Sequence, residues 1–336
     1  MLSRLSTLRV CSRKIGVLSQ RSVYTLSSSV AFCSKGSLAA YNKDSGDDAY
    51  LLSTWIVPGP LQGAALVGVA DGVGGWKKYG VDASRLSKGL ALEMQEQFER
   101  DEGADVLPTS RGLLNKSFEE LLKHGDEYAG GTTLCFGLLH PITGMILLGN
   151  LGDSMSIVIR RGKIAYCSER DAVGLAPRQL VILPDNLIQK HKQMFTAAGQ
   201  VPEWPSWIRT QTTDLVVDPF KLEHGDVIIF GTDGLFDNVY QSFIVKAVSD
   251  AMLDNGSWSD ASGEILPKTK ISGEAKLAEL LTKRAYYNSL DPSFASPFAT
   301  RSFQEGLLLP GGKPDDITTV VAMVDAHSVN SQDSDL

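Results

Sequence analysis

Aspartate residues recur at positions where the sequence predicts that β-strands meet glycine-containing turns. Asp71 directly follows the apolar run Leu66–Ala70, and Asp233 follows Val227–Phe230. Further acidic residues lie near the boundaries of other predicted strands, namely Asp47, Asp48, Asp153, Asp237, Asp315 and Asp316. Because strands are rigid and glycine permits sharp turns, a fold could gather several of these carboxylates at one edge of a sheet.

A carboxylate cluster without histidine or cysteine favours a hard divalent cation, because Mg²⁺ and Mn²⁺ prefer oxygen ligands whereas Zn²⁺ is commonly bound by nitrogen and sulfur. Two such ions, roughly 3.5–4 Å apart, convert a bridging water to hydroxide near neutral pH and stabilise in-line attack on a phosphoryl group. This chemistry is metal-assisted hydrolysis of a phosphate ester. Asp-Gly is also a common turn pair, so spacing alone leaves a turn and a ligand both open at each position.

Short predicted strands alternate with helices from residue 44 onward. The strands are apolar or β-branched runs at Ala64–Ala70, Thr132–Leu139, Met145–Asn150, Met155–Arg160, Lys163–Cys167, Asp214–Asp218, Asp226–Gly231 and Ile317–Val324. Their close spacing between residues 144 and 167 predicts antiparallel hairpins rather than crossover connections. Helices are predicted over Asp82–Arg100, Leu113–Lys123, Gln241–Leu253 and Ala275–Tyr287. This order indicates an α+β layered domain with antiparallel sheets.

Two segments bear on how a site would be built. The predicted helix Asp82–Arg100 carries a stripe of apolar side chains that could cover a sheet, formed by Leu86, Leu90, Met94 and Phe98. The interval Ala172–Trp207 contains several prolines and two tryptophans without a clear period. It is either a loop or small excursion beside a site, or plain connecting structure.

The first 43 residues differ in composition from the rest of the chain. They contain seven lysine and arginine residues and no acidic residue, so they contribute +7 to a net charge of −7 and leave −14 for the remainder. An acid-free leader rich in arginine and serine is typical of a mitochondrial transit peptide. We predict a transit peptide over residues 1–30, cleaved near Arg21–Ser29, and a location in the mitochondrial matrix. A disordered basic tail and a secretory signal are the alternatives, although the continuous apolar core of a secretory signal is lacking.

Composition marks no linker in the remainder, so a single domain is predicted over residues 31–326, followed by a polar tail over 327–336. The acidic balance argues against nucleic acid as a partner. No run approaches the ~18–20 apolar residues of a membrane span, so no stable membrane insertion is expected. Cys135 and Cys167 lack the spacing of a redox pair or a zinc site and are expected to be core residues. A monomer is the default expectation.

At these acidic positions the sequence resembles the metal-dependent serine/threonine protein phosphatases of type 2C. Six motifs match in the order found in that family: GDDA (Gly46–Ala49), VADGVGGW (Val69–Trp76), GGTT (Gly130–Thr133), NLGDS (Asn150–Ser154), GTDGLFDN (Gly231–Asn238) and DDITTVV (Asp315–Val321). One motif would be weak evidence, whereas six in order are specific. Two further stretches, DPSFASPFA (Asp291–Ala299) and GGKPDDIT (Gly311–Thr318), are similar to the mitochondrial branch of the family.

The resemblance implies a four-layer α-β-β-α sandwich, with two antiparallel sheets flanked by helices and two Mg²⁺ or Mn²⁺ ions in a cleft at one end. It implies that Asp71 bridges both ions and that the Gly72 carbonyl binds one of them. Asp233 and Asp315 would complete the set, and Asp47 and Asp48 would act through metal-bound water. A weaker third metal site would involve Asp153 and Asp237 together with Asp233.

Two positions depart from the family pattern. Lys43 stands where many members have an arginine that grips the phosphate, and lysine supplies charge without the two-pronged guanidinium. It could equally be a solvated surface residue. Val73 stands where many members have a histidine proposed as general acid, a role that typically contributes 10²- to 10⁴-fold. Either a metal-bound water replaces this histidine or turnover is slow.

The sequence therefore predicts hydrolysis of phosphoserine and phosphothreonine in mitochondrial proteins by a hydroxide that bridges two metal ions, with Asp71 and Asp233 as catalytic residues. The mitochondrial branch suggests a role in metabolism such as ubiquinone synthesis. The alternative from another class is a catalytically silent homologue that binds phosphoproteins. A metal-dependent nuclease is disfavoured by the charge of −14 outside the leader, derived from the counts above.

Overall fold

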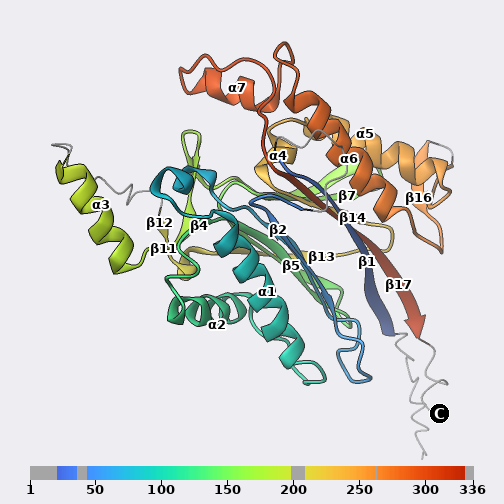
Figure 1. Ribbon diagram of the computed structural model, residues 1–336. Coiled ribbons are helices and arrows are strands. Elements are labelled where there is room, and N and C mark those ends of the chain that lie inside the picture. The colour runs from blue at the N-terminus through green and yellow to red at the C-terminus, as the bar shows by residue number, and fades with distance from the viewer. Residues whose placement is uncertain (1–20, 36–43, 198–208, 262, 330–336) are drawn as a thin grey trace, which may run out of the picture.

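Two antiparallel five-stranded sheets lie face to face at the centre of the molecule, and helices cover their outer faces (Figure 1). The structure is a computed structural model that describes residues 21–35, 44–197, 209–261 and 263–329. The first sheet has the strand order β1-β17-β14-β7-β8. Its strands are β1 (Arg21–Cys33), β17 (Ile317–Val329), β14 (Val227–Gly231), β7 (Met155–Arg160) and β8 (Lys163–Cys167).

The second sheet has the order β13-β6-β5-β3-β2, and every neighbouring pair in it is antiparallel. Its strands are β13 (Val216–Lys221), β6 (Met145–Leu151), β5 (Leu134–His140), β3 (Ala65–Ala70) and β2 (Ala49–Thr54). Of the antiparallel hairpins predicted between residues 144 and 167, the one between β7 and β8 is present. Strands β6 and β7 do not form a hairpin, because they belong to different sheets.

Helices form the two outer layers. Helices α1 (Ser84–Arg100) and α2 (Ser110–Lys123) pack on the second sheet, and α4 (Asp233–Phe236), α5 (Gln241–Asp254) and α6 (Glu274–Ser289) pack on the first. The predicted apolar face of α1 is confirmed, since all four of its side chains are fully buried: Leu86, Leu90, Met94 and Phe98. The layer order confirms the α-β-β-α sandwich.

Strand β3 shows why the central strands read as continuous apolar runs. All six of its residues are buried. Val67 and Val69 face the opposite sheet, where they meet Phe230 and Val320, whereas Leu66 faces the layer of α1 and α2. Because successive side chains point to opposite faces and both faces are covered, every position must be apolar or small.

Smaller elements surround the sandwich. A three-stranded sheet contains β12 (Arg209–Thr210), β11 (Gln179–Ile182) and β4 (Gly130–Thr132), and two hairpins are β9 (Ala172–Val173) with β10 (Ala176–Pro177) and β15 (Trp258–Ala261) with β16 (Glu264–Pro267). The remaining helical segments are α3 (Asp185–Ala197), α7 (Pro297–Gln304) and the 3₁₀ turns η1 (Gly74–Tyr79) and η3 (Thr212–Asp214).

For the interval Ala172–Trp207 the sequence left open a loop or small excursion beside a site and plain connecting structure; its described part contains β9, β10, β11 and α3. Strand β11 forms because it pairs with β4, a contact between segments about fifty residues apart that local periodicity does not reveal. The Trp76 indole N–H donates to Gln179 Oε1 at 2.7 Å, which ties β11 to the turn that follows β3. The interval is therefore an excursion packed beside the end of β3.

Strand β1 begins ten residues before the predicted start of the domain at residue 31. It pairs with β17 along its whole length, from Arg21 opposite Val329 to Cys33 opposite Ile317. Strand β17 in turn continues past the predicted boundary at residue 326. The paired strands β1 and β17 thus reach past residue 31 on one side and residue 326 on the other. Residues 1–20 of the predicted leader lie outside the described residues.

Candidate metal centre

Asp71 is held at the end of β3 by contacts to its own main chain. Its carbonyl accepts hydrogen bonds from the Thr133 N–H at 2.9 Å and from the Thr132 hydroxyl at 3.0 Å. Its N–H donates to Thr133 Oγ1 at 3.3 Å. The GGTT motif therefore fixes the backbone of Asp71 and leaves its carboxylate free to point away from the sheet.

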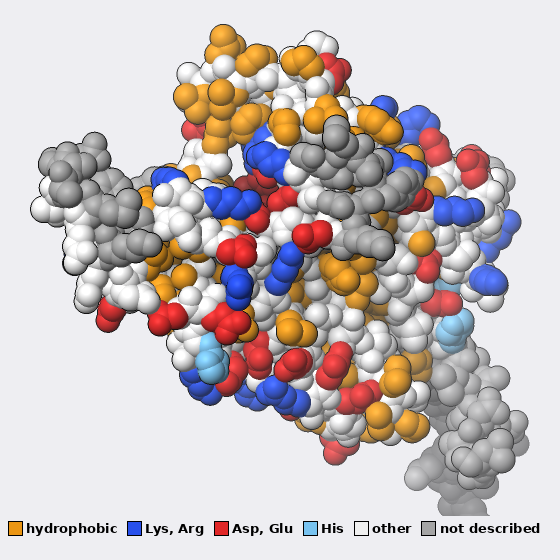
Figure 2. All heavy atoms as spheres, viewed as in Figure 1, with side chains coloured by type: hydrophobic (Ala, Val, Ile, Leu, Met, Phe, Trp, Pro, Cys, Tyr) orange, Lys and Arg blue, Asp and Glu red, His pale blue; other side chains and the backbone are white. Residues whose placement is uncertain are grey.

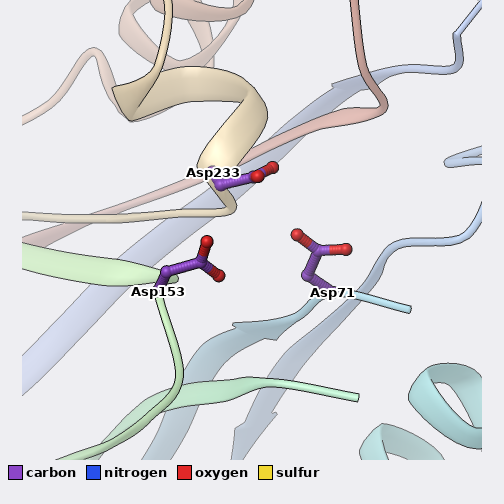
Figure 3. A group of neighbouring side chains, drawn as sticks. All are labelled: Asp71, Asp153 and Asp233. Carbon is purple, nitrogen blue, oxygen red and sulfur yellow. The ribbon is translucent and has the colours of Figure 1, made fainter. Parts of the chain in front are cut away.

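Asp233 reaches the same place from the first sheet, and Asp153 reaches it from the connection between the two sheets. Asp153 lies two residues after β6 and two residues before β7, and Asp233 is the first residue of α4, after β14. Oxygen atoms of Asp71, Asp153 and Asp233 all lie within 4.8 Å of one another. Figure 3 shows the three carboxylates converging from three separate chain segments. Asp153 and Asp233 are buried, and Asp71 lies at the partly exposed side of the group.

Burial and mutual repulsion make this cluster hold protons when no cation is bound. Burial, together with the nearby Asp233 carboxylate, raises the pKa of Asp71 well above its ordinary range. The same two causes raise the pKa of Asp153 to about 7. Burial also raises the pKa of Asp233, although the Lys313 ammonium opposes this shift. The cluster is therefore built for a positive partner that compensates its negative charge.

The residues present fit a hard divalent cation. The donors are carboxylate oxygens, with no histidine or cysteine in the group. In addition, Asp153 Oδ1 is buried without a hydrogen-bond partner among the described residues. An unsatisfied buried carboxylate oxygen is costly, and a bound cation at this position would satisfy it.

Stability of the metal-free protein is expected to fall as pH rises from about 4 through about 7. Folding raises the pKa of Asp153 from an ordinary value of 3.8 to about 7, so the folded state keeps a proton that the unfolded state releases. Thermal unfolding in EDTA at several pH values measures the effect, and Asp153→Asn should flatten the profile. A melting temperature that climbs steadily over this range would contradict the assignment.

Asp47 and Asp48 lie on the neighbouring turn and have different surroundings. Asp48 is buried, and its Oδ2 accepts a hydrogen bond from the Thr232 hydroxyl at 2.8 Å. Burial and the Asp316 carboxylate raise the pKa of Asp48 well above its ordinary range. Asp47 forms an ion pair with Lys77 at 2.5 Å, and its N–H donates to Asp316 Oδ2 at 2.8 Å. The Asp316 carboxylate thus supports this acidic turn by accepting a hydrogen bond from the main chain of Asp47.

A lysine, Lys313, bridges Asp315 and the central cluster. Asp315 Oδ2 lies 2.9 Å from the lysine Nζ, and the same ammonium contacts Asp233 and, at 3.1 Å, Asp237. Lys313 is the lysine of the GGKPDDIT stretch, two residues before Asp315. Its place among acidic residues in the sequence was the available signal for this contact, but the sequence analysis assigned it no role.

Asp237 is surrounded by cations, unlike Asp153. Its Oδ1 accepts hydrogen bonds from Arg170 and Arg301, each at 2.6 Å. Burial alone would raise the pKa of Asp237, but Lys313, Arg170 and Arg301 outweigh burial and lower it to about 2. The sequence analysis assigned no role to these arginines, because nothing near either residue in the sequence predicts a shared partner.

The glycines after Asp71 and Asp233 are required by close packing rather than by turn conformation. Neither glycine has a positive φ. A Cβ on Gly72 would lie 2.3 Å from the Ala83 carbonyl oxygen, and one on Gly234 would lie 1.9 Å from that of Asp316. The Asp-Gly pairs therefore place each carboxylate where two backbone segments approach closely, which a turn pair would not explain.

The structure describes only one of the two positions that depart from the family pattern. Lys43 lies outside the described residues. Val73 donates its N–H to the Gly131 carbonyl at 2.9 Å, and its side chain packs with Trp76 and Val81. Val73 therefore offers no proton donor at the position where a histidine was sought.

The surface above the cluster alternates in charge. Figure 2 shows acidic side chains set back in a hollow between basic ones, beneath an apolar surface around α7. The exposed apolar residues of that surface include Phe303, Leu307, Leu308 and Leu309.

None of the helices in the described part of the chain combines the length and apolar character needed to cross a bilayer.

Comparison with known proteins places the chain among protein phosphatases. No family model matches it. The protein phosphatase PTC7 homolog of Danio rerio is 31% identical over 281 residues, covering 83% of this chain and 81% of the relative. The Homo sapiens homolog is also 31% identical over 281 residues, with 83% and 79% covered. The homolog named fig from Drosophila erecta is 32% identical over 292 residues, with 85% and 79% covered.

A solved structure supports the same fold. The photosystem II phosphatase PBCP superposes with a TM-score of 0.61 at 22% identity, covering 89% of this chain and 98% of the other. The type-2C resemblance based on six ordered motifs is thus matched by relatives of similar length that align with more than four fifths of the chain. The chain belongs to the PTC7 family of protein phosphatases.

Proposed function

We propose that this protein is a metal-dependent phosphatase that hydrolyses phosphoserine and phosphothreonine in proteins. The observation that carries the proposal is the convergence of Asp71, Asp153 and Asp233, with a buried Asp153 oxygen that has no partner among the described residues. Membership of the PTC7 family supports a phosphoprotein as substrate. A purely structural role would leave three mutually repelling carboxylates without compensation.

In this proposal Mg²⁺ or Mn²⁺ is held by Asp71, the Gly72 carbonyl, Asp233 and Asp315. The buried carboxylate of Asp153 is a further ligand. Two bound ions would supply Lewis acidity at the phosphoryl group and lower the pKa of bound water. Asp47 and Asp48 would act through metal-bound water, as the type-2C resemblance implies.

Residues around the cluster prepare it for this work. Thr232 fixes the Asp48 carboxylate by a 2.8 Å hydrogen bond, and Lys77 holds Asp47 at 2.5 Å. Both carboxylates therefore keep defined orientations, that of Asp48 in the interior. Preorganised groups of this kind need no rearrangement when charge develops on the phosphoryl oxygens. Lys43 is proposed to attract the substrate phosphate.

The purified protein is expected to release phosphate from a phosphoserine peptide only when Mn²⁺ or Mg²⁺ is present. EDTA should abolish the release and added Mn²⁺ should restore it, because the donor set is made of oxygens that require a hard cation. Phosphate release is measured by a colorimetric assay. The control is a peptide that carries phosphotyrosine in place of phosphoserine and is otherwise the same. A protein that binds the phosphoserine peptide but releases no phosphate under any metal would instead be the silent homologue.

We further propose that the enzyme acts on phosphoproteins in the mitochondrial matrix and takes part in metabolic regulation, such as that of ubiquinone synthesis. The acid-free leader with a charge of +7 supports this address. The body of the chain shows no basic stripe that would suggest nucleic acid as a substrate. Import into isolated mitochondria tests the location.

A further inference from the structure

Asp237 forms the centre of a cluster of fixed charges. Both of its oxygens are engaged, Oδ1 by Arg170 and Arg301 at 2.6 Å each and Oδ2 by Lys313 at 3.1 Å. Its side chain is only 2% exposed. A buried carboxylate with three charge-assisted hydrogen bonds has little remaining capacity for another ligand.

The three cations come from separate parts of the fold. Arg170 follows β8, Arg301 lies on α7, and Lys313 lies on the segment that leads into β17. The exposed fractions of their side chains are 18%, 29% and 26%, so all three are largely enclosed. Charges held by three independent elements are not a chance surface pairing, because each element is anchored by its own packing.

The neighbouring Asp153 shows the opposite situation. It has a buried oxygen without a hydrogen-bond partner among the described residues, whereas both oxygens of Asp237 accept charge-assisted hydrogen bonds. The two carboxylates therefore differ in what they require. Asp153 requires a cation, and Asp237 already has three.

A divalent ion at Asp237 would be opposed electrostatically. It would approach the Arg170 and Arg301 guanidinium groups within a few ångströms, and repulsion between like charges in a partly buried site is strong. Arginine cannot lose its proton to relieve this repulsion. A third metal ion would need to displace at least one of these cations from its ion pair.

We infer that Arg170 and Arg301 take the place of a third metal ion, so that this chain binds two divalent ions and Asp237 anchors these arginines instead of ligating metal. Lys313 is not part of this substitution, because its ammonium also contacts Asp233 and Asp315, two of the proposed metal ligands. The inference rests on the proposed function, since it takes Asp71, Asp153 and Asp233 as the ligands of the bound ions. The fixed cations supply positive charge beside the metal centre at any metal concentration.

Counting bound Mn²⁺ tests the inference directly. Free Mn²⁺ is measured by electron paramagnetic resonance during titration of the full chain up to millimolar metal. We expect two ions per chain in the unchanged protein and in Asp237→Asn. The double variant Arg170→Gln, Arg301→Gln should gain a third ion, because it frees Asp237 Oδ1. Three ions in the unchanged protein, with the third lost in Asp237→Asn, would overturn the inference.

Thermal unfolding in EDTA gives a second readout that does not depend on metal. Asp237→Asn should lower the melting temperature by at least about 5 °C, because it removes the carboxylate that pairs with two enclosed arginines, Arg170 and Arg301. Asp153→Asn should raise the melting temperature, because it removes a carboxylate that is repelled by its neighbours. Asp250→Asn, on the exposed face of α5, serves as the control and should change little. If Asp237→Asn were stabilising as well, Asp237 would be a metal ligand like Asp153.

The two arms separate this inference from the proposed function. A chain that binds no Mn²⁺ would contradict the proposed phosphatase centre, and the unfolding comparison would still decide the role of Asp237. A chain that binds three ions and hydrolyses phosphopeptides would uphold the function and reject only the inference.

Discussion

An Asp233→Asn variant is expected to lose at least ~100-fold in kcat/KM on a phosphoserine peptide in saturating Mn²⁺. Asparagine keeps the size of the side chain but removes the charge that faces Asp71 and Asp153 within the 4.8 Å cluster. Metal-ion stabilisation of a phosphoryl transition state is worth several kcal/mol, and each ~1.4 kcal/mol corresponds to tenfold in rate. Steady-state kinetics over a range of Mn²⁺ concentrations measures the loss.

Asp250→Asn is the matched control for this variant. Asp250 lies on α5 in an exposed ion pair with Lys246 at 2.6 Å, and exposed pairs contribute little to stability. The control should keep both activity and fold. Circular dichroism of Asp233→Asn confirms that its fold is retained, since Asp233 also pairs with Lys313. If folded Asp233→Asn hydrolysed the peptide in Mn²⁺ as fast as the unchanged protein does, Asp233 would not be a catalytic residue.

A chain that begins at residue 21 is expected to fold, whereas one that begins at residue 34 is expected to be insoluble or unfolded. The shorter chain lacks β1, whose 13 residues all pair with β17. Its loss would expose one edge of β17 and the core residues against which Tyr24, Leu26 and Val30 of β1 pack. Domains are stabilised by only ~5–15 kcal/mol, so removing a whole strand exceeds the available margin. Soluble yield and thermal unfolding of the two chains measure the difference.

The same strand bears on the predicted cleavage of the leader. A cut within Arg21–Ser29 would remove part of β1, so we expect the mature N-terminus to lie at or before Arg21. Mass spectrometry of the processed chain after import into isolated mitochondria locates it. A mature N-terminus downstream of residue 29, on a protein with full activity and unchanged melting temperature, would show that β1 is dispensable.

The central strands were predictable from sequence because both of their faces are buried. Such strands appear as continuous apolar runs, as in Ala65–Ala70 and Val227–Gly231. Strand β1 was not predictable, since it is an edge strand with partly exposed, serine-rich residues inside a basic leader. Its structure depends on β17, almost three hundred residues away, and local composition pointed to a different role.

The chemistry of the site was predictable to the level of residue type. Aspartates at the ends of strands indicated oxygen ligands, and three of them converge as expected. Which of the aspartates meet was decided by packing, because Asp71 follows a strand of one sheet, Asp233 follows a strand of the other, and Asp153 lies on a connection between the two. Only the face-to-face stacking of the two sheets brings these carboxylates together.

By itself, the sequence determined the order of the motifs, the oxygen-only donor set and the charge difference between the leader and the remainder. These are properties of residue type and of short spacing, which do not depend on the fold. The tertiary structure alone decided which carboxylates already have cationic partners. Arg170, Arg301 and Lys313 are 67, 64 and 76 residues from Asp237 in the chain. Electrostatic energy depends on distance in space, so Asp153 and Asp237, which read alike in the sequence, differ in the fold.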